Sequence, residues 1–120
     1  MNKTKQRIAI AEACGWTDVD LDDGEPWGFA PGEERDPKDI TSVHGSWVPD
    51  YLNDLNAMHE AEESMTEVQL SLYAHHMIRS VRHAKGIPDH ESRYPVPFVL
   101  RATAEQRCEA FLRTLGLWEG

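Results

Sequence analysis

Apolar residues recur at helical spacing in four stretches of the chain, separated by segments rich in glycine and proline. The spacing predicts four helices, over residues 4–14, 51–63, 67–84 and 104–115. Thr66 with Gln69 and Thr103 with Gln106 fit the capping box that opens a helix, so the third and fourth helices are expected to start there. Asp50 stands where the N-cap of the second helix is expected.

The apolar faces of these helices predict the core. We expect it to contain Ile8, Leu52, Leu55, Met58, Tyr73, Met77, Val81, Phe111, Leu112 and Leu115. Residues 17–49 hold several glycines and prolines and predict a loop-rich insert with one or two short strands within 27–48, and a further strand is expected at 97–101. The prediction is a helix-rich α+β fold: about four helices with a small antiparallel sheet.

Length and charge narrow the picture further. The chain has 120 residues, a length that suits a single domain over residues 1–120. Its formal charge is −9. Residues 12–63 contain fifteen acidic and two basic side chains. An acidic surface repels phosphate backbones, so direct nucleic-acid binding is disfavoured and a protein partner with a basic surface is favoured. The plainer interpretation is a charged surface that keeps the protein in solution.

The acidic residues are densest between the first helix and the first expected strand. Five carboxylates fall within eight residues and are followed by two aromatic side chains, which makes a candidate partner-binding segment of Asp18, Asp20, Asp22, Asp23, Glu25, Trp27 and Phe29. We expect the acidic part to be an exposed, mobile loop. The segment resembles a calcium-binding loop only in part, because Phe29 stands where the loop needs its bidentate glutamate.

A second candidate is a basic cluster near the end of the third helix. Arg79, Arg82 and Lys85 are expected to contact a phosphate or another anion, although cations also favour a helix C-terminus without any ligand. No two of the six histidines have the spacing that places metal ligands on one helix face, and His59 with Glu62 supplies only two ligands. No metal site or cofactor is therefore expected.

Catalytic motifs are absent from the sequence. Cys14 and Cys108 lie at apolar positions of predicted helices, where a thiol behaves as a small hydrophobe, and the patterns typical of a nucleophile or a phosphate-binding loop do not occur. No catalytic residue is assigned. The chain also lacks an apolar stretch long enough for a membrane span, so we expect a protein of the host bacterial cytoplasm, whether monomer or homodimer.

Three stretches carry a resemblance to a known family. IAEACGW at 10–16, YLNDLNAMHEAE at 51–62 and RATAEQRCEAFLRTLGLW at 101–118 together resemble short phage and prophage proteins grouped as phage ABA-sandwich domain proteins, over about 37 of 120 residues. The resemblance implies a phage or prophage gene. It implies no activity and no catalytic residues, because the family has none established.

These observations favour a small acidic accessory protein of a phage or prophage. We expect it to be non-enzymatic and to bind and inhibit a host factor, such as a defence component or nuclease, through its acidic half. The first alternative is a small-ligand or nucleotide-binding protein, a sponge that uses the basic cluster. The second alternative is a metal-dependent hydrolase built from histidine and aspartate.

Overall fold

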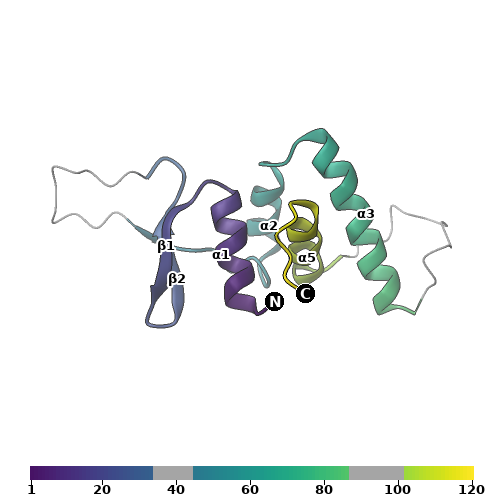
Figure 1. The fold of residues 1–120 in the computed structure, drawn as a ribbon, viewed down its shortest axis with the longest axis horizontal. Coiled ribbons are helices and arrows are strands. Elements are labelled where there is room, and N and C mark those ends of the chain that lie inside the picture. The colour runs from purple at the N-terminus through teal and green to yellow at the C-terminus, as the bar shows by residue number, and fades with distance from the viewer. Residues whose placement is uncertain (34–44, 87–101) are drawn as a thin grey trace.

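The computed structural model describes residues 1–33, 45–86 and 102–120. In these ranges the α+β fold is confirmed, with four helices and a three-stranded antiparallel sheet of order β1-β2-β3 (Figure 1). The elements are α1 Lys3–Ala13, β1 Thr17–Asp22, β2 Glu25–Phe29, β3 Ser46–Trp47, α2 Leu55–Glu62, α3 Glu67–Ala84 and α5 Ala104–Thr114.

Helix α5 lies at the centre of the helical part, packed against α1, α2 and α3 (Figure 1). Phe111 and Leu112 on α5 are fully buried, and the Phe111 ring meets Tyr73 of α3 edge-on, with ring centroids 6.4 Å apart. The sheet lies beyond α1, at the opposite end of the molecule from the C-terminus of α3. This arrangement places the acidic and basic candidate residues at different ends of the chain's fold.

Both predicted capping boxes are present. The Thr66 hydroxyl accepts a hydrogen bond from the Gln69 backbone N–H at 3.2 Å while the Gln69 side chain accepts one from the Thr66 N–H, and Thr103 and Gln106 repeat the pattern at the start of α5. Each box satisfies backbone donors that have no partner inside the helix. The two helices begin where the sequence predicted them.

The predicted start of the second helix is wrong. Its N-cap is Asp54, whose carboxylate accepts from the backbone N–H groups of Asn56 and Ala57, and α2 begins at Leu55. The Asp50 side chain instead accepts from the Asn53 amide, and residues 51–53 form a turn that buries Tyr51. Two aspartates four residues apart both suit an N-cap, and burial of the turn selects the second.

The acidic residues are exposed, as expected, but they form a strand and a turn and not a loop. Residues 17–22 form β1, which pairs with β2 through the register Asp22↔Glu25 and Leu21↔Pro26. Asp23 and Gly24 connect the strands with positive φ values of 52° and 82°, the backbone geometry of a two-residue Asp-Gly hairpin turn. The Asp-Gly dipeptide is the sequence signal for this hairpin. The third strand is only Ser46–Trp47, and the strand expected at 97–101 lies outside the described residues.

Most of the predicted core is confirmed. Leu52, Met58, Tyr73, Met77, Val81, Phe111 and Leu112 are buried. Leu55 is 44% exposed because it opens α2 rather than lying one turn inside it. Leu115 is partly buried and packs against the core, whereas Ile8 is only partly buried. Among the described helices, none has the length and apolar character needed to cross a membrane.

Candidate functional site

The hairpin gathers its carboxylates on one side. Residues directly opposite each other on antiparallel strands point to the same side of the sheet, as do alternate residues along a strand. The register pairs Asp20 with Trp27 and Asp22 with Glu25, so Asp20, Asp22 and Glu25 share one face, which we call the acidic face. Its three acidic side chains are exposed.

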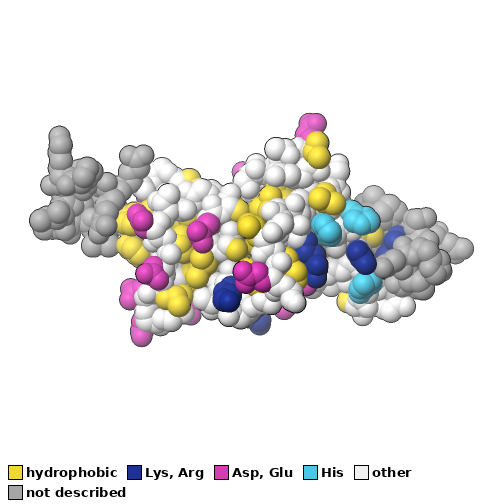
Figure 2. Space-filling view, in the orientation of Figure 1, with side chains coloured by type: hydrophobic (Ala, Val, Ile, Leu, Met, Phe, Trp, Pro, Cys, Tyr) yellow, Lys and Arg dark blue, Asp and Glu magenta, His cyan; other side chains and the backbone are white. Residues whose placement is uncertain are grey.

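Asp18 and Asp23 add charge at the two ends of β1. Asp18 lies at the irregularity between Thr17 and Asp20, with a φ of 51°, and Asp23 lies in the turn; both are exposed. Within the described residues no cation forms an ion pair with Asp18, Asp20, Asp22 or Asp23. Acidic side chains gather around this end of the molecule in Figure 2.

Glu25 differs from the other four carboxylates because Arg7 of α1 holds it. An Nη of Arg7 donates to Glu25 Oε2 at 2.9 Å, the other Nη donates to the carbonyl of Val48 at 2.7 Å, and Nε donates to Pro49. One half-buried guanidinium thereby ties the hairpin and the chain leaving β3 to the first helix. Glu25 has a structural role besides its charge.

The aromatic residues beside the acidic face divide into a buried and an exposed group. The Phe29 side chain is only 5% exposed and meets the half-buried Trp27 edge-on at 5.3 Å between centroids. Trp47 of β3 lies opposite Trp27 in the register and is 58% exposed. Of the two aromatic residues predicted to contact a partner, Phe29 is buried within this chain. Trp47 is the exposed aromatic side chain of this sheet, and only the strand pairing could have revealed it.

Glycine residues allow this close packing of aromatic side chains. A Cβ on Gly45 would overlap the ring of Trp27, so the backbone before β3 passes directly against the indole. A Cβ on Gly28 would press on Val19 and on the Thr17 carbonyl, 3.1 Å away, so β2 also approaches β1 closely. The hairpin is therefore a packed element with a defined surface.

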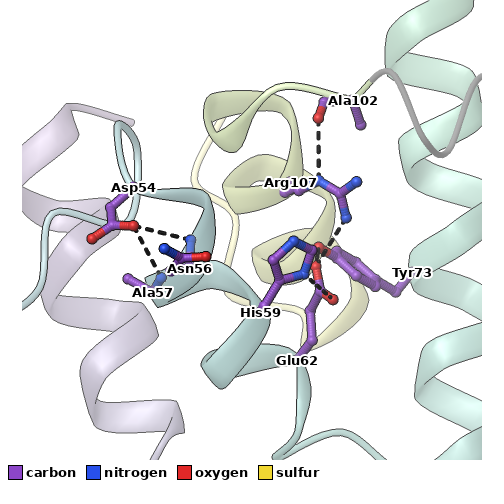
Figure 3. A network of polar contacts seen from close by, with 8 residues as sticks. All are labelled: Asp54, Asn56, Ala57, His59, Glu62, Tyr73, Ala102 and Arg107. Carbon is purple, nitrogen blue, oxygen red and sulfur yellow. Dashed lines mark hydrogen bonds and ion pairs between the residues drawn. The ribbon is translucent and has the colours of Figure 1, made fainter.

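A second polar cluster joins three helices around Glu62 (Figure 3). Glu62 Oε1 accepts a hydrogen bond from the Tyr73 hydroxyl at 2.7 Å and one from Arg107 at 3.1 Å, and Oε2 contacts His59 Nδ1 at 3.3 Å. Arg107 Nε also donates to the carbonyl of Ala102, just before α5. Burial, together with the bond to Glu62 and the charge of that carboxylate, raises the pKa of Tyr73, so the phenol stays protonated as a donor.

The geometry of the Glu62 cluster indicates a structural role. Its charges are matched, its donors have acceptors, and Arg107 has a side chain only 9% exposed. The sequence showed only the His59–Glu62 pair, because Tyr73 and Arg107 come from distant parts of the chain.

The basic cluster lies at the other end of the fold. Arg79 and Lys85 are exposed, whereas Arg82 is 8% exposed. A cavity of about 210 Å³ between α3 and α5 is lined by His76, Arg79, Ser80, His83, Glu109 and Arg113. The cavity therefore contains one of the three predicted anion contacts, Arg79, and adds residues that the sequence did not suggest.

The two cysteines are free thiols. Burial raises the pKa of Cys108 to about 12, and burial also raises the pKa of Cys14, so both remain protonated near neutral pH. Among the described residues, no three His, Cys, Asp or Glu side chains are arranged to hold a metal ion.

Comparison with known proteins gives no relative. No family model, no curated protein and no solved structure significantly matches this chain.

Proposed function

We propose that this protein is a non-enzymatic accessory protein of a phage or prophage that binds and inhibits a basic host protein through its hairpin. The observation that carries the proposal is a set of four exposed aspartates without ion-pair partners in the described structure, on a folded hairpin beside an exposed tryptophan. The basic surface that it covers is one that normally holds nucleic acid, so the protein competes with the phosphate backbone.

Electrostatics support this role. Clustered carboxylates of one sign create a field that attracts a basic partner and speeds the diffusional encounter. Because the hairpin is held by Arg7 and by its own strand pairing, little ordering of the acidic face is required on binding. A fixed array of negative charge is what a phosphate-binding surface accepts.

Trp47 supplies the apolar contact that charge alone lacks. Tryptophan is enriched among the residues that contribute most binding energy at protein interfaces. Its 58% exposed side chain lies next to Trp27 and within the same sheet as the acidic face. Trp47 takes the place of the buried Phe29 among the aromatic residues that contact the partner.

The origin and the compartment rest on sequence resemblance. The likeness to short phage proteins supports a host factor as partner, a defence component or a nuclease, and the host bacterial cytoplasm as the place of binding. The two cysteines, protonated and unpaired, are compatible with a reducing compartment.

The test combines capture and kinetics. The protein is used to capture basic proteins from a bacterial host lysate at low salt, and the association rate of the captured partner is then measured against salt, with and without competing duplex DNA. The variant D18N/D20N/D22N/D23N keeps Glu25, because Glu25 pairs with Arg7. We expect this variant to associate about tenfold more slowly at low salt, with a shallower salt dependence.

The matched control removes four exposed carboxylates elsewhere: Glu60, Glu63, Glu67 and Glu105, each changed to Gln. It alters the net charge equally and should associate at nearly the original rate. W47A should release the partner faster without lowering the free energy of unfolding. The proposal is wrong if no basic protein is captured, if DNA does not compete, or if the two fourfold variants behave alike.

A further inference from the structure

We propose that the cavity between α3 and α5 binds a phosphate group, either as inorganic phosphate or as the phosphate of a small phosphorylated molecule. This site is separate from the acidic face and independent of the function proposed above. Figure 2 shows histidine side chains (cyan) and cationic side chains (dark blue) over this end of the molecule.

Two helices build the cavity walls. His76, Arg79, Ser80 and His83 lie on one side of α3, since their positions follow the i, i+3, i+4 and i+7 spacing. Arg113 faces them from α5, one turn after Glu109. The volume of about 210 Å³ is below the roughly 300–1,000 Å³ typical of pockets for drug-sized ligands, and it suits a small ion or the head of a larger molecule.

Arg113 is held in position for an anion. Its Nε lies 3.5 Å from Glu109 Oε2, and its guanidinium carbon lies 5.2 Å from the centre of the Trp118 ring. Within the described residues these contacts leave the two terminal nitrogens of Arg113 without a hydrogen-bonded acceptor. A guanidinium presents its donors as a planar fork that matches phosphate oxygens, and Ser80 adds a hydroxyl donor.

The local field is positive. Partial burial, together with the nearby charges of His75, Arg113 and Arg79, lowers the pKa of His76, and Glu109 opposes this only as the smallest contribution. Neighbouring positive charges repel one another, and a bound anion reduces this repulsion. Pairing with Arg113 offsets the carboxylate of Glu109, which also lines the cavity.

Histidine makes the site sensitive to pH. His76 lines the cavity and adds a positive charge when it is protonated. Among the described residues, the titratable and charged groups that act on His76 are His75 and Arg79 on its own helix and Glu109 and Arg113 on α5. Because a bound anion favours protonated His76, anion binding should raise the pKa of His76.

The cationic residues that line this cavity differ from the three that the sequence predicted as anion contacts. Arg79 keeps the place that the sequence gave it, while Arg82 lines the adjoining cavity with His75 and Ile78. Arg113 enters from a helix that follows in the chain after the undescribed residues 87–101, and no periodicity within α3 could have pointed to it.

The experiment is an NMR titration of the whole chain with sodium phosphate, following backbone amides and the histidine side chains at constant ionic strength. We expect saturable shifts at the cavity residues with a Kd on the order of 1 mM. R113Q and R79Q should each weaken binding by about fivefold or more, as expected for loss of one charge-assisted contact. K3Q removes the same charge from an exposed site on α1 and should leave the Kd unchanged.

The NMR signals of the histidine side chains distinguish phosphate binding by the arginines from a purely structural role of these residues. Phosphate at a fixed concentration close to the original Kd should raise the pKa of His76 in the original chain and raise it less in R113Q, because R113Q binds less phosphate at that concentration. A parallel titration with adenosine monophosphate distinguishes the two sources: a lower Kd than for inorganic phosphate assigns an esterified phosphate, and an equal Kd assigns the free ion. Shifts that do not saturate, a K3Q variant as weak as R113Q, or an unchanged pKa of His76 would overturn the proposal.

Discussion

Phe111 is a core residue at the contact between α5 and α3. It is fully buried on α5 and meets Tyr73 of α3 at an interplanar angle of 87°. Perpendicular aromatic pairs contribute beyond the area they bury, because the positive edge of one ring meets the negative face of the other. Truncation at this position therefore removes both burial and a specific contact.

The variant F111A should lower the free energy of unfolding by about 3–5 kcal/mol, the range for buried aromatic side chains changed to alanine. Urea unfolding followed by circular dichroism measures it. V68A is the control, because Val68 is 82% exposed on α3 and its truncation should change stability by no more than about 0.5 kcal/mol. A cost for F111A as small as that of V68A would show that α5 does not pack as described.

The hairpin is the element on which the acidic face depends. Its turn needs two consecutive residues with positive φ, and Asp23 and Gly24 supply them at 52° and 82°. Aspartate and asparagine tolerate this conformation, glycine adopts it without steric cost, and β-branched residues disfavour it. The short Asp-Gly connection also fixes the register that places Asp20 and Asp22 on one side with Glu25.

We therefore expect G24V to cost about 1–2 kcal/mol of hairpin stability, through the left-handed backbone that valine resists. Hydrogen exchange of the β1 and β2 amides measures this locally. G24N is the matched control and should retain most of the protection, since asparagine accepts positive φ. Equal hydrogen-exchange protection of the β1 and β2 amides in G24V and G24N would contradict a turn with positive φ at Gly24.

At the scale of the whole molecule, the Glu62 cluster connects α2, α3 and α5. One carboxylate accepts from Tyr73 and from Arg107, and Arg107 also bonds the carbonyl of Ala102. Hydrogen bonds to a charged group contribute more than neutral ones, and an arginine left without its partner in a buried setting is costly. The cluster therefore links the three helices through charged hydrogen bonds.

The variant E62Q keeps the shape of the side chain and removes its charge. It should lower the free energy of unfolding by about 1.5–3 kcal/mol, the range for hydrogen bonds to charged groups. Denaturant unfolding monitored by both fluorescence and circular dichroism measures it. E63Q changes the neighbouring exposed carboxylate and should be nearly neutral. If E62Q and E63Q had the same free energy of unfolding, the charge of Glu62 would not contribute to stability.

Local chemistry let the sequence determine the helices. The capping boxes at Thr66 and Thr103 involve residues only three positions apart, so the sequence alone predicts where α3 and α5 begin. The apolar periodicity of these helices is also local, and it predicts the burial of Phe111 and Leu112. The choice between Asp50 and Asp54 as N-cap was not local, because it turned on the burial of Tyr51 and Leu52.

Tertiary structure alone decided the candidate sites. The sequence showed that carboxylates are dense at 18–25, but strand register decided which of them share a face and brought Trp47 beside Trp27. It showed cations near the end of α3, but helix packing set Arg113 of α5 across from Arg79. Arg82, which the sequence grouped with Arg79, is 8% exposed. Periodicity describes one element at a time, whereas a binding surface is made where two elements meet, and that depends on how the core packs.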